Sequence, residues 1–173
     1  MPAPQVTYPE LMPVGRAGFI AESRVNAQIM SGNAGGAIPP ARFVRVSATG
    51  VAGAVTPTVA LPTLTAHVTG DLSFGFTLQD PSAASGTGEN PGYVQFDQIP
   101  ILREGVMWVI SEDAVATWGL PVFVRFTAGG AGQTIGRVRT DVDGGAAVAL
   151  PGATFMGTCA AESLVKIEYR PQQ

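Results

Sequence analysis

Hydrophobic and polar residues alternate along much of the chain with the period of two that is typical of β-strands. The clearest case is LVKIEYR, residues 164–170, where Val165, Ile167 and Tyr169 lie on one face and charged residues lie on the other. This pattern predicts a strand that buries one face and exposes the other.

Further runs of strand length fill the chain after residue 41, and turns rich in Gly and Pro separate them. These runs are RFVRVSA at 42–48, HVTGDLSFGFTLQD at 67–80, YVQFDQIPIL at 93–102, REGVMWVI at 103–110 and PVFVRFT at 121–127, the last with Val122, Val124 and Phe126 on one face. We find no amphipathic helix beyond a turn or two at SEDAVATW, residues 111–118. Many short strands with such turns predict an all-β fold, a single antiparallel β-barrel or sandwich domain.

The first 40 residues lack this regularity because prolines and glycines interrupt every window. Proline fixes φ and restricts the residue before it, which favours extended chain. We therefore expect an extended N-terminal arm over residues 1–40 and the β domain over residues 41–173. Such an arm either lies against another surface or is a flexible terminus, and we favour the docked arm.

Composition narrows the classes of function. Charged residues make up 13% of the 173 residues and apolar residues 46%, against ~25% charged in average domains, so we expect partners to cover much of the surface. A net charge of −3 with a single lysine argues against nucleic-acid binding, which needs clustered cations. The chain has no apolar run of membrane-spanning length and no secretory signal, so we expect no membrane partner and synthesis in the cytosol.

Candidate catalytic and ligand-binding motifs all have simpler structural interpretations. The glycine-rich AGGAGQTIG, residues 128–136, precedes strand-like sequence rather than a helix, so a tight hairpin is expected instead of a phosphate loop. DVDGG, residues 141–145, lacks the glutamate that completes a calcium loop, which favours a hairpin turn. His67 is expected to be solvated or structurally bonded, and Cys159 to be a buried thiol. We therefore predict no catalytic residue, no metal site and no cofactor.

The connection SEDAVATWGLP, residues 111–121, carries the adjacent acids Glu112 and Asp113 and the aromatic Trp118. Neighbouring carboxylates on extended chain point apart, whereas a general acid/base pair needs convergent ones. We therefore interpret the stretch as a connection between two adjacent core strands. Trp118 either caps the barrel end or faces a partner, and we favour the cap.

In order and spacing, the motifs from residue 100 to residue 170 resemble those of the head-decoration, or structural cement, proteins of tailed bacteriophages. The motifs are ILREGVMWV, GLPVFVRFTAGGAGQTIGRVRTD and AVALPGATFMGTCAAESLVKIEYR, and TYPELMPVGRAGFIAES near the start is similar to the arm of that family. Residues 50–92 depart from the pattern of the family.

The resemblance implies a non-enzymatic virion structural protein that binds the outside of the phage head and bridges neighbouring major capsid subunits. It also implies homodimers or homotrimers on the outer capsid surface after assembly in the host cytoplasm. The arm residues that we expect to contact the capsid are Tyr8, Val14, Arg16, Phe19 and Ile20.

Two other functions remain open. One is a β-sandwich carbohydrate- or receptor-binding module of a virion, for which Trp118 is the best candidate contact. The other is a hydrolase that uses His67 and a carboxylate, and it has the least support because no motif accompanies that histidine.

Overall fold

The computed structural model describes residues 16–21, 27–47, 56–70, 73–79, 92–131 and 133–171. Its elements are, in order, β1 (Gln28–Ala34), β2 (Phe43–Val46), β3 (Thr58–Ala60), α1 (Ala66–Thr69), β4 (Ser73–Thr77), β5 (Gln98–Ser111), β6 (Pro121–Arg125), β7 (Val138–Arg139), the 3₁₀ turn η1 (Asp143–Gly145), β8 (Ala147–Phe155) and β9 (Ser163–Tyr169). The predicted all-β fold is confirmed, and the strands close into a barrel with additional strands.

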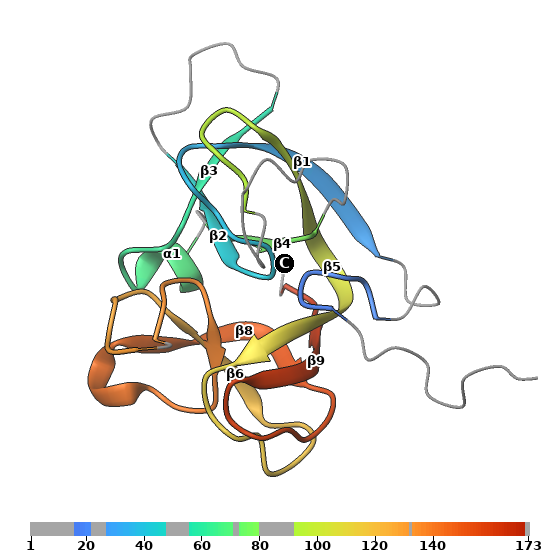
Figure 1. The fold of residues 1–173 in the computed structure, drawn as a ribbon, viewed down its shortest axis with the longest axis vertical. Coiled ribbons are helices and arrows are strands. Elements are labelled where there is room, and N and C mark those ends of the chain that lie inside the picture. The colour runs from blue at the N-terminus through green and yellow to red at the C-terminus, as the bar shows by residue number, and fades with distance from the viewer. Residues whose placement is uncertain are drawn as a thin grey trace, which may run out of the picture.

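The strand pairings form two closed rings that share β5. In the N-terminal ring the order is β1-β3-β2-β4-β5, and a β1–β5 pairing closes it. In the C-terminal ring the order is β5-β7-β6-β8-β9, and a β5–β9 pairing closes it. Figure 1 shows the two rings as an upper and a lower lobe, with β5 running from one into the other. All pairs are antiparallel except β1–β3 and β5–β7.

Strand β5 changes partners near its middle. Its first half pairs with β1 and β4, and its second half pairs with β9 from Gly105 onward. Gly105 has φ of +137°, a conformation that residues with a Cβ rarely adopt. The sequence predicts separate strands at 93–102 and 103–110, whereas the structure has one continuous strand, β5, that passes through this glycine and pairs in both rings.

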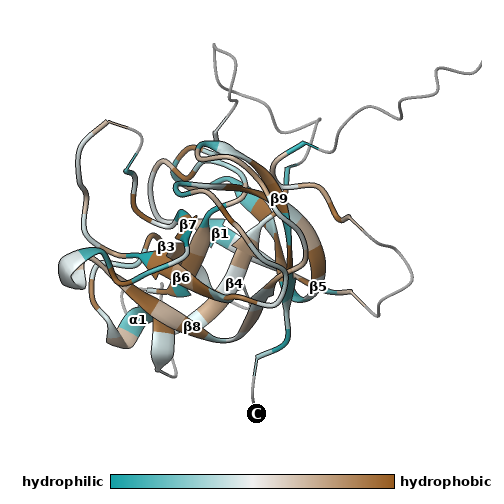
Figure 2. Cartoon of the chain, turned by 90° about the horizontal axis from the view of Figure 1, so that it is seen from below, coloured by the Kyte–Doolittle hydropathy of each residue, from teal (hydrophilic) through white to brown (hydrophobic). Residues whose placement is uncertain are grey.

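Each ring has its own apolar packing. One cluster fills the N-terminal ring and includes Val44, Val59, Ile99 and Ile101. The other, larger cluster fills the C-terminal ring and extends between the rings, where the rings of Phe43, Phe76 and Tyr169 pack edge to face. Figure 2 shows the hydrophobic residues concentrated on the strands.

The alternation in the last strand is confirmed, because Val165, Ile167 and Tyr169 are all buried in β9. The face predicted for residues 121–127 is also buried in large part. Val122 and Val124 of β6 are buried, and Phe126, just after β6, is half-buried.

Several local predictions are wrong. The two strands that flank residues 111–121 are not neighbours, since β7 lies between β5 and β6. The glycine-rich stretch is not a tight hairpin, because all of residues 126–137 connect β6 to β7. DVDGG is not a hairpin turn either, because η1 leads to β8, which pairs with β6 rather than with β7. His67 lies on α1 and not on a strand.

Part of the predicted arm belongs to the body of the protein. Residues 28–34 form β1, which pairs with β5 over six residue pairs, and Ala34 and Ile38 are buried in the core. Of the residues before β1, only 16–21 and 27 are described. The extended arm as a separate unit stays a prediction.

Candidate functional site

Residues 16–21, which we call the N-terminal segment, lie against the second half of β5. The amides of Gly18 and Ala21 donate to the carbonyls of Trp108 and Val106, each at 2.8 Å, and the amide of Trp108 donates to the carbonyl of Phe19 at 2.9 Å. Strand β7 meets β5 at only one residue pair. The N-terminal segment therefore satisfies backbone groups that the C-terminal ring leaves open on β5.

Gly18 fixes the position of the N-terminal segment. Its φ is +84°, and a Cβ at this position would lie 2.9 Å from the amide nitrogen of Gln79. The carbonyl of Gly18 accepts a 2.9 Å hydrogen bond from that same amide. The segment is therefore held between β5 and the chain that follows β4, and only glycine fits this conformation without strain.

The five predicted contact residues are only partly described. Arg16 is exposed, Phe19 is half-buried, and Ile20 pairs with Met107 and packs against the larger apolar cluster. Tyr8 and Val14 lie outside the described residues. A role of these side chains in capsid contacts stays a prediction.

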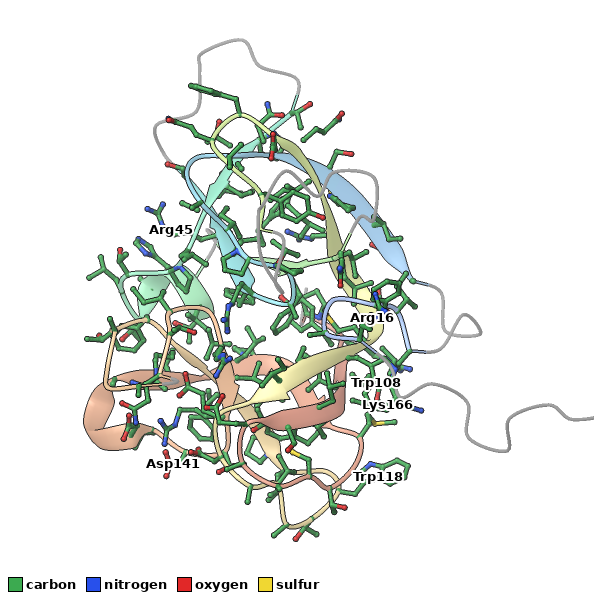
Figure 3. The ribbon with its side chains drawn as sticks, viewed as in Figure 1. Arg16, Arg45, Trp108, Trp118, Asp141 and Lys166 are labelled. Atoms are coloured by element: carbon green, nitrogen blue, oxygen red, sulfur yellow. The ribbon has the colours of Figure 1, made fainter. Side chains whose placement is uncertain are left out.

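An aromatic and cationic face lies beside this segment. Trp108 of β5 and Lys166 of β9 are direct cross-strand partners, and the ammonium of Lys166 lies 5.3 Å from the centre of the indole ring. Figure 3 shows Arg16, Trp108 and Lys166 on the same side of the molecule. This arrangement of Lys166 over the half-buried indole of Trp108 is a cation–π interaction.

A buried ionic network stabilises the C-terminal ring, and the sequence patterns did not predict it. The side chains of Glu112 and Arg125 are 2% and 1% exposed, and the Nε of Arg125 donates to both carboxylate oxygens, at 3.1 and 2.8 Å. Glu112 also accepts hydrogen bonds from the amide of Thr134, at 3.1 Å, and from Arg139, at 3.3 Å. Burial acts to lower the pKa of Arg125, but its hydrogen bonds to Glu112 and to Asp143 outweigh this effect and raise the pKa.

Three aspartates close the outer side of this network. Asp113, Asp141 and Asp143 each form an ion pair with Arg139, at 3.1, 2.7 and 2.9 Å. The carboxylates of Glu112 and Asp113 both reach Arg139, so the prediction that these neighbouring carboxylates point apart is wrong. The hydrogen bond from Arg125 lowers the pKa of Asp143. With every carboxylate paired to a guanidinium, the network is suited to stabilising the fold and not to proton transfer.

A second arginine pair lies near this network. Arg42 is half-buried, and its pKa is lowered to about 10, first by burial and then by the neighbouring charge of Arg137. Arg137 itself pairs with Glu162. The position of Arg42 is therefore electrostatically unfavourable for the fold.

The remaining chemical candidates have structural roles. The Nδ1 of His67 accepts a 3.1 Å hydrogen bond from the amide of Thr63, as expected for a structurally bonded histidine. Cys159 is half-buried against the larger apolar cluster, and its backbone pairs with that of Val115. Among the residues that the structure describes, no cluster of His, Cys, Asp and Glu could hold a metal ion.

Trp118 does not cap the barrel. Its side chain is 65% exposed on the connection between β5 and β6, and Figure 3 shows it at the periphery of the C-terminal ring. The connection is held by paired backbone hydrogen bonds between Val115 and Cys159, and by the amide of Gly119, which donates to the carbonyl of Phe155. These bonds turn the indole outward, away from the core.

No helix within the described parts of the chain has the length and apolar character to cross a membrane.

Comparisons with known proteins agree with this architecture. The sequence model of a family described as "Structural cement protein (E217 gp24/Pam3 gp6)" matches residues 4–170. A chain in the solved structure titled "The capsid of Myoviridae Phage XM1" is similar with a TM-score of 0.67 and 14% sequence identity, over 97% of each chain. That likeness supports the fold alone. No curated protein matches the chain.

Proposed function

The chain belongs to the structural cement protein family of phages, and from this premise we propose that it binds the outside of the head and bridges neighbouring major capsid subunits. The family match over residues 4–170 is the observation that carries the proposal. As a member of this family the chain is a virion structural protein with a non-enzymatic role and an association with capsid proteins.

Three features of the chain support this finer assignment. Low charge and a single lysine suit a surface that partners cover, because lysine is depleted in buried interfaces. The N-terminal segment pairs with β5 through three backbone hydrogen bonds, and backbone pairing of this kind is also used by extended chains between proteins. Many copies on one shell would also convert a modest affinity of each contact into strong overall retention.

We further propose that the capsid contacts include Tyr8, Val14, Arg16, Phe19 and Ile20, and that the protein assembles as a homodimer or homotrimer. The hydrogen bonds between the N-terminal segment and β5 make two deletion variants necessary. Deleting residues 2–20 would also remove the hydrogen bonds to Trp108, whereas deleting residues 2–15 leaves them in place.

The test mixes purified wild-type protein and both deletion variants with expanded, undecorated heads. Co-sedimentation measures binding, and electron microscopy of the particles locates the added density. We expect the wild type to bind and the 2–15 deletion to bind more weakly while it unfolds at the same temperature. Absence of wild-type binding would contradict the cement function, and full binding by the 2–15 deletion would contradict the role of the residues before Arg16.

The exposed indole of Trp118 favours a second candidate, a carbohydrate- or receptor-binding module of the virion. Exposed aromatic rings provide flat apolar faces on which a partner can stack. Glycan binding by the wild type that disappears in Trp118→Ala would support this alternative, and absence of glycan binding by the wild type would remove it.

A further inference from the structure

A cleft of about 250 Å³ opens where the two rings meet. Its walls come from α1 and β4 of the N-terminal ring, from β8 and β9 of the C-terminal ring, and from the shared strand β5. The apolar part of the wall includes Val68, Leu150 and Pro151, and the polar part includes Ser73, Arg103 and Tyr169.

Arg103 is the cation of this cleft. Its guanidinium lies 4.7 Å from the centre of the Phe74 ring. Within the described parts of the chain, no carboxylate pairs with Arg103 and its guanidinium donates no hydrogen bond, although Arg125, Arg139 and Arg170 each pair with an acid. A guanidinium carries five N–H donors, and those of Arg103, without an acceptor in the described parts of the chain, can donate to a ligand in the cleft.

The stacking on Phe74 orients the free donors. When an aromatic ring covers one face of a guanidinium, the N–H edge stays available and its rotamer is restricted. The planar fork of that edge matches the two oxygens of a carboxylate. The side chains of Ser73 and Tyr169 line the same cleft, and they offer additional polar contacts to a bound group.

We propose that this cleft binds the carboxylate of an aspartate or glutamate side chain from a neighbouring major capsid subunit. This inference rests on the proposed cement function and names one of its contacts. Charge complementarity selects the carboxylate, since Arg103 is the single cation among the described residues that line the cleft, and a phosphate dianion is usually held by several donors or cations. The volume suits a side chain rather than a larger ligand, and Val68, Leu150 and Pro151 in the wall can contact its methylene groups.

The test compares Arg103→Gln with Arg170→Gln as a matched control. Both substitutions remove one arginine charge, but Arg170 is exposed and pairs with Glu168 outside the lining of the cleft. We expect Arg103→Gln to weaken binding to expanded heads by roughly tenfold or more, with little change for Arg170→Gln. Arg103→Lys keeps the charge without the fork, so it is expected to weaken binding too, and it serves if Arg103→Gln fails to fold.

A direct probe separates carboxylate recognition from other effects. Sodium propionate is titrated into the wild type, and the Nε–Hε resonance of Arg103 is followed by NMR, against sodium phosphate and sodium chloride at equal ionic strength. A saturable shift with propionate alone supports the proposal, whereas equal shifts with all three salts overturn it.

The outcomes for the cleft and for the cement function are distinguishable. If wild-type protein fails to bind heads, the cement function fails and the capsid subunit is excluded as the occupant. If the wild type and Arg103→Gln bind heads equally, the cleft proposal alone is overturned. If Arg103→Gln loses self-association but not head binding, the occupant is a second copy of the chain and the proposed capsid contact is wrong.

Discussion

Glu112→Gln tests whether the buried ionic network stabilises the C-terminal ring. Four hydrogen bonds end on this carboxylate, three from the guanidiniums of Arg125 and Arg139 and one from the amide of Thr134. Glutamine keeps the shape of the side chain but replaces one acceptor oxygen with an NH₂ group. That group would face the Nε–H of Arg125, so two donors would meet inside the protein.

The size of the effect follows from burial. Removing one partner of a buried ion pair costs about 3–5 kcal/mol. Asp141 and Asp143 still accept from the two arginines in the variant, so we expect a loss in the lower part of that range, about 3 kcal/mol. For a domain of this length each kcal/mol lowers Tm by about 2–4 °C, and the expected decrease in Tm is therefore about 6–12 °C.

The assay is equilibrium unfolding in guanidinium chloride, followed by tryptophan fluorescence and circular dichroism, together with a thermal scan. Glu168→Gln is the matched control because Glu168 pairs with the exposed Arg170, and surface pairs contribute about 0–1 kcal/mol. A Glu112→Gln protein within about 1 kcal/mol of the wild type would refute the reasoning, since that is the size of a surface effect.

Three further perturbations have expected outcomes. Arg42→Met should raise the free energy of unfolding by about 1–3 kcal/mol in chemical denaturation, because it removes a half-buried cation beside the like charge of Arg137, and a decrease would contradict the unfavourable position inferred for Arg42. Burial, and then the charge of Arg45, lower the pKa of His67 below 6.5, so the unfolded chain takes up this proton first and stability falls as the pH drops below that value. Protonation also removes the Nδ1 acceptor of the Thr63 amide, so Tm should decrease more from about pH 7.5 to about pH 5.5 in the wild type than in His67→Gln; equal decreases would exclude this contribution. Gly18→Ala should strain the N-terminal segment and speed hydrogen exchange at the Trp108 amide, with a smaller change in global stability, and unchanged exchange would show that the segment tolerates a Cβ.

Local patterns in the sequence were sufficient for the fold class and for the buried faces of strands. Tyr169 could be assigned to the core because β9 buries one face and exposes the other. Strand order could not be predicted in the same way. The two residues of β7 carry too little periodicity to reveal that they lie between β5 and β6.

The ionic network was hidden for a related reason. In PVFVRFT the position of Arg125 alternates with buried valines, which predicts an exposed side chain. Its partners lie 13 and 18 residues away in sequence, and only the chain path between β5, β6 and η1 brings them together. An arginine within an apolar run of strand length, with acids on the preceding and following connections, was the one available signal.

The sharing of β5 has a mechanical consequence for the whole chain. A force that pulls the two rings apart acts along β5, which is continuous through both rings. The covalent backbone of β5 and its hydrogen bonds to neighbouring strands resist this force. We therefore expect the chain to transmit strain between distant attachment points as a single cooperative unit.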